Sequence, residues 1–326
     1  MFRYLVRRIL WAILLFVVIT FVTFVIFFMA PSNTARLVCG GEQAKPDCIA
    51  AATERLGLNK PLPYQYALFL KRLVVDHSLG ESFITRRSVN EIIGQAAPVT
   101  ASLVFGGAIL WMMIGLVVGI FSALRPRSLL DRTAMLFVLV GVSAHPVWIG
   151  LIFLYLFGYK WGGFTHLPIA GYADFFNPPE GEPGGPAEWF SHMVLPWVTF
   201  AILFAALYVR MIRASVMEAL NEDYVRTARA KGAPERRVLG AHVLRNAMLP
   251  VVTMLGMDIG LALGGAIFTE TVYGLPGLGR TAIQAVQQYD LAVVQGVVVF
   301  STLAIIIFNL IVDLLYAWID PRIRLT

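Results

Sequence analysis

Charged residues are scarce in this chain. Asp, Glu, Lys and Arg make up only 14% of its 326 residues, whereas 58% are hydrophobic. A soluble domain of ordinary composition carries about 25% charged residues, so this balance excludes a soluble protein. Short segments of alternating polarity are also missing, which argues against a membrane β-barrel. The composition therefore predicts a polytopic α-helical membrane protein.

Motifs for nucleotide and metal binding are missing as well. The chain contains no G-x-x-x-x-G-K-[ST] segment, so we expect that it does not hydrolyse ATP by itself. Its five histidines are dispersed, without the H-x-x-x-H or Cys/His spacing that suits a metal ion. We find no fixed-period repeat and no polar stretch long enough to fold as a soluble domain. If the chain moves a solute uphill, the energy must come from another protein.

What the chain does contain is six apolar runs of bilayer length. At a rise of 1.5 Å per residue, about 20 residues cross the hydrocarbon core of a membrane. The runs are roughly Ile9–Ala30, Thr100–Leu124, Ala134–Phe157, Met193–Val216, Leu249–Tyr273 and Leu291–Trp318. They predict an all-α fold with six transmembrane helices.

The basic residues predict the orientation of these helices. If the N-terminus is cytoplasmic, 16 of the 26 Lys and Arg fall in short cytoplasmic loops and tails beside the spans. This positive-inside asymmetry places both termini in the cytoplasm. Because topology explains most of the basic charge, we predict contact with membrane lipid and no nucleic-acid binding.

The orientation divides the chain into four parts. Residues 1–30 form the cytoplasmic N-terminus and the first transmembrane helix, and 31–97 form an extracytoplasmic loop. Residues 98–318 form a core of five transmembrane helices, with a cytoplasmic loop at 217–248. Residues 319–326 form a cytoplasmic tail.

The 31–97 loop carries signals for short helices. Residues 65–75 have apolar side chains spaced for one buried face, at Leu68, Phe69, Leu73 and Val74. In residues 88–98, a serine can cap a second short helix, which we expect to end by Pro98.

Cys39 and Cys48 are the two cysteines of the chain, and both fall in this outer loop. In an oxidising exterior they could close a local disulfide, the alternative being two unlinked thiols.

The segment "GVSAH" (141–145) resembles a nucleophile elbow without its last glycine. Ser143 and His145 are two residues apart on an expected helix, so they point to different sides and do not form a nucleophile–base pair. Because Pro146 follows, a kinked helix whose polar atoms satisfy freed carbonyls is the simpler interpretation. Both residues are candidates for lining a transport pathway.

Asp258 lies near the middle of the fifth apolar run. A carboxylate is costly in lipid, so it should face the protein interior or water. It could bind an amine of a transported substrate, or it could pair with a neighbouring polar group. We therefore include Asp258 among the pathway candidates.

The stretch between the fourth and fifth runs, 222–250, carries six Lys or Arg and three acidic residues. Acidic residues open a helical segment at 222–231, Gly232 is placed to end it, and Pro234 suits the first position of a second helix running towards Pro250. Charge topology explains the arginines. It does not explain the apolar residues Tyr224, Val225, Val238 and Leu239, which would suit docking into a groove of another protein.

These motifs resemble those of a known family. "YVRTARAKG" followed by "HVLRNAMLP" resembles the cytoplasmic "EAA" coupling loop of binding-protein-dependent ABC importers, in its dipeptide/oligopeptide/nickel version. "RLGLNKPLPYQY", "ETVYGLPGLGR" and "VDLLYAWIDPRIR" extend the resemblance nearly end to end, and the long first outer loop indicates the B-type subunit. The literal E-A-A is absent, since Arg226, Thr227 and Ala228 occupy the aligned positions.

The resemblance implies a type I ABC importer permease (MetI-like) architecture in a bacterial or archaeal inner or plasma membrane. The chain would contribute no catalysis and no cofactor site, because ATP and Mg would bind to two partner ATPase subunits. A second homologous permease subunit would complete the pathway, and an extracytoplasmic solute-binding protein would deliver the solute. The residues implied in coupling to the ATPase are Tyr224, Arg226, Thr227, Ala228, Lys231, Gly232, Ala233 and Pro234.

Three other functions remain open at this point. The cargo could be nickel or another small solute in place of di- or oligopeptides. The chain could act alone as a channel or secondary transporter, although inverted repeats and relay carboxylates are lacking. It could also be a membrane-embedded hydrolase built on Ser143.

Overall fold

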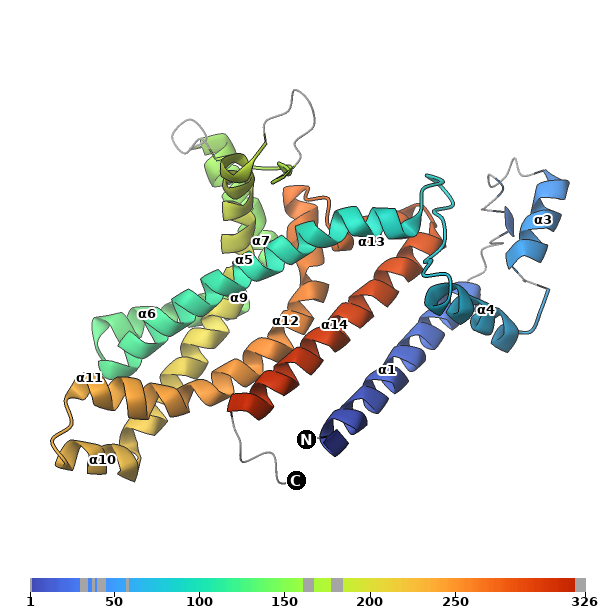
Figure 1. Ribbon diagram of the computed structural model, residues 1–326. Helices are drawn as coiled ribbons and strands as arrows, with labels where there is room; N and C mark the ends of the chain where they lie inside the picture. The colour runs from blue at the N-terminus through green and yellow to red at the C-terminus, as the bar shows by residue number, and fades with distance from the viewer. Residues whose placement is uncertain are drawn as a thin grey trace. The chain divides into compact units, whose positions relative to one another are not determined.

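The computed structural model describes residues 2–29, 35–36, 39, 45–56, 59–160, 167–176 and 184–319. These residues are almost entirely helical, with one isolated antiparallel bridge between Glu81 and Ser88. The helical elements (Figure 1) are α1 (Phe2–Met29), α3 (Pro46–Leu56), α4 (Leu62–Val74), α5 (Val89–Leu124), α6 (Leu129–Ser143), α7 (Pro146–Phe153), η2 (Leu154–Lys160), α9 (Pro186–Asn221), α10 (Asp223–Ala230), α11 (Glu235–Arg237), η3 (Val238–Leu244), α12 (Arg245–Tyr273), α13 (Leu278–Gln287) and α14 (Leu291–Ile319). The predicted C-terminal tail falls, after Ile319, outside the described residues.

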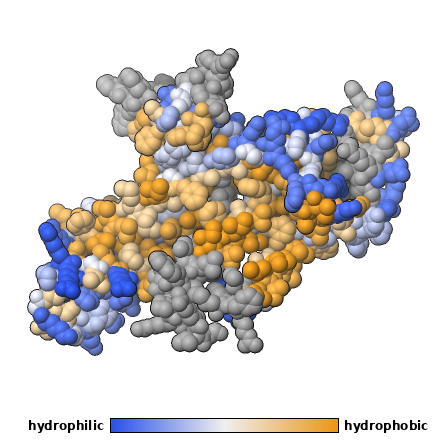
Figure 2. All heavy atoms as spheres, viewed as in Figure 1, coloured by the Kyte–Doolittle hydropathy of each residue, from blue (hydrophilic) through white to orange (hydrophobic). Residues whose placement is uncertain are grey.

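Five described helices are long and apolar enough to cross a membrane, and the count rises to six if α6 and α7 form one bent span. The helices of this pair meet at an angle of 104°. The predicted third span is therefore not one straight helix. Pro146 has no N–H for the helix to use, so α6 ends at Ser143 and α7 begins after His145. Figure 2 shows hydrophobic residues covering the long helices.

The chain divides into two compact units. The first contains residues 1–99 and 277–310, and the second contains residues 100–276 and 311–325.

The first unit packs the 65–75 region against the N-terminal helix. The predicted amphipathic helix is present as α4, but its buried face is centred on Gln65, Tyr66 and Phe69, and Val74 is exposed. The hydroxyl of Tyr66 lies 2.9 Å from that of Thr20 and donates to the Val17 carbonyl at 3.0 Å. The prediction was therefore right about the helix and wrong about part of its face.

The predicted stop at Pro98 is also wrong. Residues 89–124 form one continuous helix, α5, with Pro98 inside it. The first turns of α5 pack against α13 and α14 through Val89, Ile93 and Leu278. In a long apolar helix, tertiary packing of this kind outweighs the loss of one backbone hydrogen bond at proline.

The second unit is built around α9, which packs against α6 and α12. Glycines allow α5 to approach α9 closely: a Cβ added to Gly115 would lie 2.7 Å from the Tyr208 Cβ, and one added to Gly119 would lie 3.0 Å from the Ile212 Cβ. This small-residue pair therefore serves packing inside the chain. The buried faces of α9 and α12 hold the polar groups discussed below.

Candidate functional site

Residues 222–237 form a polar projection at one end of α9, and hydrophilic residues gather over it (Figures 1 and 2). The first helix of the projection, α10, ends in a turn built by hydrogen bonds. The Gly232 N–H donates to the Arg229 carbonyl at 2.9 Å, and the Ala233 N–H donates to the Ala228 carbonyl at 3.2 Å. Gly232 has φ +78°, the left-handed conformation that favours glycine, so this is a Schellman-type helix end.

A bidentate ion pair joins the two sides of this turn. Arg229 donates to Glu235 through Nη2 at 2.6 Å and through Nε at 3.2 Å. The same hydrogen bonds raise the pKa of Arg229 and lower the pKa of Glu235 from their ordinary values. Arg226 also lies 3.6 Å from Asp223 within α10. The turn is therefore fixed in both backbone and side chains.

The apolar side of the projection is mostly internal. Val225 and Val238 are fully buried and Ala228 is nearly so, whereas Tyr224 is 38% exposed. The expectation that Val225 and Val238 would dock into another protein is therefore wrong: both are buried within this chain, where α10 packs against η3 and α9. Tyr224 and the partly exposed Leu239 remain for an outside contact.

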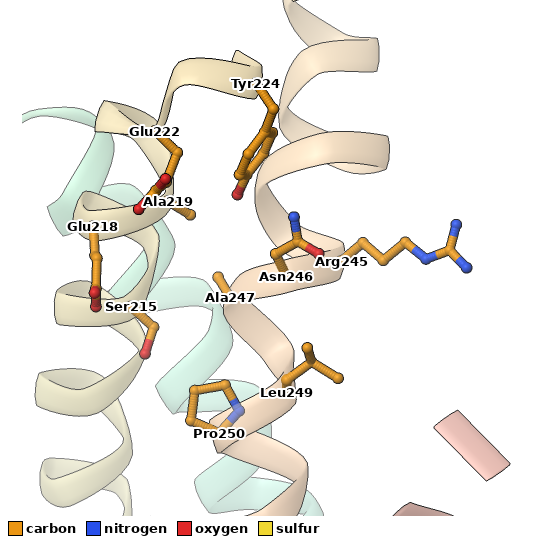
Figure 3. A pocket seen from close by; sticks show the side chains of 10 residues that line it. All are labelled: Ser215, Glu218, Ala219, Glu222, Tyr224, Arg245, Asn246, Ala247, Leu249 and Pro250. Atoms are coloured by element: carbon orange, nitrogen blue, oxygen red, sulfur yellow. The ribbon is translucent and has the colours of Figure 1, made fainter. Parts of the chain in front are cut away.

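A hollow of about 580 Å³ lies beside the projection (Figure 3). One wall comes from the last turns of α9, with Ser215 and Glu218, and from Glu222 between α9 and α10, and the other comes from the start of α12. Tyr224 points between these walls towards Asn246, while the Arg245 side chain extends away (Figure 3). The hollow is thus lined by two carboxylates and an aromatic side chain at the base of α10.

The eight residues that the sequence assigns to this projection are gathered on α10 and its turn, and they differ in exposure. Ala228 is buried and Ala233 is half-buried, and the others are exposed, namely Tyr224, Arg226, Thr227, Lys231, Gly232 and Pro234. Pro234 is the residue before α11, one position earlier than predicted. The second helix does not stop at Pro250, which lies inside α12.

Ser143 and His145 lie at the break between α6 and α7. The Ser143 hydroxyl donates to the Leu139 carbonyl at 2.8 Å, and His145 Nδ1 accepts from the Val147 N–H at 3.3 Å. Each side chain thus satisfies backbone groups at a helix end, as the kinked-helix interpretation predicts. The His145 ring also makes an edge contact with Phe268, with centroids 4.9 Å apart. The two residues do not share a helix, contrary to the sequence prediction.

Asp258 is 9% exposed and accepts a hydrogen bond from the buried hydroxyl of Tyr208 at 2.8 Å. It lies far along α12 from the 222–237 projection. The structure therefore does not bring the three pathway candidates and the projection together into one site.

Cys39 and Cys48 form a disulfide in the structure, with a Cα–Cα distance of 5.9 Å. It closes a short loop ahead of the main part of α3. The pair lies in the first unit.

Two protein-family models match the chain. The model described as "Binding-protein-dependent transport system inner membrane component" matches residues 115–325, and its N-terminal companion matches residues 1–104. The chain belongs to this family. It is therefore the permease component of a binding-protein-dependent ABC transporter, a non-catalytic transport subunit of the membrane.

Several curated relatives match the permease over its full length. It is 37% identical to the dipeptide transport system permease protein DppB of Alkalihalophilus pseudofirmus, over 99% of this chain and 100% of that one. It is also 37% identical to DppB of Escherichia coli K12 and 35% identical to the di/tripeptide transport system permease DppB of Pseudomonas aeruginosa, with 99% of each chain covered. These matches confirm the family resemblance seen in the sequence.

The fold of the permease also matches a solved structure, a crystal structure of an amino acid ABC transporter with histidines. The TM-score is 0.50 at 16% identity, over 70% of this chain and 94% of the other. The likeness supports the helical fold of an ABC transporter permease. Within the described residues, no group of three or more His, Cys, Asp or Glu is close enough to hold a metal ion.

Sequence reasoning missed one polar site of the permease, at the start of α6. Asp131 accepts hydrogen bonds from Arg213 Nε at 2.6 Å, from Arg213 Nη2 at 3.0 Å and from the Ser122 hydroxyl at 2.5 Å. The Arg127 N–H adds a fourth at 2.8 Å. This site ties α5, α6 and α9 together close to the projection. In the sequence, Arg213 is one of many basic residues that the positive-inside rule explains. The only sign of the site is therefore Asp131 itself, three positions after Ser128.

Proposed function

We propose that the permease and a second, homologous permease subunit form the pathway of an ATP-driven importer of di- or oligopeptides. The cargo follows from the printed names of the relatives, which are dipeptide and di/tripeptide permeases matched from end to end. The importer would lie in a bacterial or archaeal inner or plasma membrane, with both termini of this chain in the cytoplasm. The 16 basic residues beside one set of loops support this orientation.

The 222–237 projection is then the lever of the transporter. Two ATPase subunits would bind ATP and Mg, and one of them would receive the projection through its exposed residues, including Tyr224, Arg226 and Lys231. A segment that transmits force must move as a unit. The Schellman turn at Gly232 and the Arg229–Glu235 pair make α10 and α11 such a unit. This rigid turn is the observation that carries the assignment.

The transport cycle requires no covalent chemistry from this chain. A solute-loaded binding protein docks on the outer side, and closure of the ATPase pair moves the two projections together. That movement turns the membrane helices outward and exposes the pathway to the solute. Hydrolysis of ATP then returns the helices to the inward state.

The proposal can be tested by co-purification followed by transport. A tagged permease from native membranes should co-elute with ATPases that carry nucleotide-binding loops and with a second permease. Liposomes that contain this complex, its binding protein and internal ATP should accumulate a labelled dipeptide. Accumulation of nickel in place of peptide would contradict the cargo, and activity of this chain alone would contradict the ABC mechanism.

The lever itself is tested at Gly232. Nothing lies within 4 Å of a Cβ added there, so a substitution acts through the backbone alone. Gly232→Pro fixes φ near −65° and removes the N–H bonded to Arg229, so it should abolish uptake while membrane insertion stays normal. Gly232→Asn is the matched control, because asparagine tolerates φ near +78° and should retain most uptake. Normal uptake by the proline variant would overturn the role of the projection.

A further inference from the structure

Three polar side chains meet in the interior of the second unit. They come from three helices: Trp111 from α5, Tyr208 from α9 and Asp258 from α12. The rings of Trp111 and Tyr208 have centroids 6.2 Å apart, and the Tyr208 hydroxyl donates to Asp258 Oδ2 at 2.8 Å. Trp111 and Tyr208 are fully buried. The cluster therefore lies inside the helix bundle of this unit.

The cluster is not a closed structural network. Among the described residues, no Lys, Arg or His forms an ion pair with Asp258, and the one hydrogen bond recorded for its carboxyl group comes from Tyr208. The buried indole of Trp111 lies beside the ring of Tyr208 within the same cluster. Buried polar networks that serve only stability are normally satisfied from within. In this one, the carboxyl group of Asp258 has acceptor capacity left over.

The position of Asp258 makes that capacity accessible. The residue is thirteen positions from the start of α12 at Arg245 and fifteen from its end at Tyr273, so it lies at the middle of the helix. It retains 9% of its surface, whereas its two partners retain none. Its neighbour Met257 is 54% exposed. Asp258 is thus buried but keeps a small exposed fraction, beside an exposed residue of α12.

We propose that Asp258, oriented by the Tyr208 hydroxyl, binds the α-ammonium group of a peptide during its passage through the permease. This inference rests on the proposed function, because it takes the cargo to be a peptide. A charged carboxylate inside a membrane protein is stabilised by a cation close to it, and among the described residues none pairs with Asp258. Every peptide with a free N-terminus carries that cation. The structure thus assigns the missing charge to the cargo.

A metal ion fits this position less well than an ammonium group. A divalent cation takes several ligands, and Asp258 belongs to no cluster of His, Cys, Asp or Glu among the described residues. An ammonium group needs only a few acceptors at hydrogen-bond distance. One carboxylate held in place by one tyrosine hydroxyl satisfies that need, and the site remains weak enough for release.

The test uses the complete importer in liposomes and compares the wild type with Asp258→Asn. Asparagine keeps the shape of the side chain and can still accept from Tyr208, but it has no charge. Because a hydrogen bond to a charged group contributes roughly 1.5–3 kcal/mol, uptake of a labelled dipeptide at limiting concentration should fall about tenfold or more. Asp258→Glu, which restores the charge, should recover part of the uptake.

A second substrate distinguishes a role of Asp258 in binding the ammonium group from a role in the structure of the permease. An N-acetylated dipeptide lacks the ammonium group, so the wild type and Asp258→Asn should take it up equally at a concentration that saturates the binding protein. If the wild type and Asp258→Asn took up the free dipeptide equally, the proposed site would be wrong. It would also be wrong if Asp258→Asn reduced the uptake of free and acetylated dipeptides equally. If the wild-type importer carries no peptide at all, the proposed function fails and the cargo assigned to Asp258 fails with it.

Discussion

Two buried aspartates of the same helical unit differ in how many partners their carboxyl groups have. Asp131, at the start of α6, accepts four hydrogen bonds, two of them from the guanidinium of Arg213. Asp258, in the middle of α12, accepts a hydrogen bond from Tyr208, and no cation among the described residues pairs with it. Both side chains are at least nine-tenths buried. Burial alone therefore does not explain the difference.

The difference agrees with the roles that we propose for the two ends of the unit. Asp131 ties three helices together through its four hydrogen bonds, as a lever that transmits movement without deforming would require. Asp258 keeps free acceptor capacity, as a group that binds passing cargo would require. A polar group in the membrane thus stabilises structure when its partners are internal, and it serves recognition when its partner comes from outside.

The largest expected effect is that of Asp131→Asn. The change leaves the mostly buried guanidinium of Arg213 without its counter-ion, which costs roughly 3 kcal/mol when one partner of a buried pair is removed. The thermal midpoint of the purified complex and the yield of inserted protein should both fall clearly. Arg213→Lys is the graded control, because it keeps the charge but loses the bidentate geometry. Its thermal midpoint should lie between those of the wild type and Asp131→Asn. A wild-type midpoint for Asp131→Asn would remove the contrast between the aspartates.

A smaller effect is expected at the turn of the projection. Glu235 has a lowered pKa because Arg229 donates to it, so the pair stabilises the turn at neutral pH and is lost as the pH falls through that lowered value. Glu235→Ala should therefore speed hydrogen exchange of the 228–233 amides at neutral pH. In acid, below the pKa of the carboxyl group, the variant and the wild type should converge.

The contribution of this pair is modest because both side chains are exposed to water. Lys231→Ala is the control, since it removes an exposed cation outside the pair and should leave exchange unchanged. A difference of equal size at neutral and acid pH would mean that Glu235 acts by packing and not by charge.

How far the sequence predicts this molecule depends on the range of the signal. The long apolar runs predict the spans, and Gly232 after a helical segment predicts the turn, because both signals are local. The broken third span could be predicted only in part. Pro146 predicts a kink, but it does not predict two helices at an angle of 104°. The helix ends predicted at Pro98 and Pro250 were wrong, because the packing of the surrounding helix decides whether a proline ends it.

The candidate sites show the same limit. The sequence could identify Asp258 as unusual, because a lone carboxylate in an apolar run is visible without a structure. It could not find Tyr208, which is 50 positions away on another helix, or the Asp131–Arg213 pair, which spans 82 positions. Val225 and Val238 were predicted to face a partner, because the local sequence cannot reveal that α9, α10 and η3 pack together and bury both residues.

The smallest expected effect on stability is that of Asp258→Asn, the same chemical change as at Asp131. Among the described residues no cation pairs with Asp258, so loss of its charge removes a desolvation cost and leaves the hydrogen bond from Tyr208 in place. The free energy of unfolding should change by less than about 1 kcal/mol, in the stabilising direction. Thermal midpoints of the two matched asparagine variants, measured in one detergent, check this directly. If Asp258→Asn destabilises the complex as much as Asp131→Asn, Asp258 has an internal partner and its charge is structural.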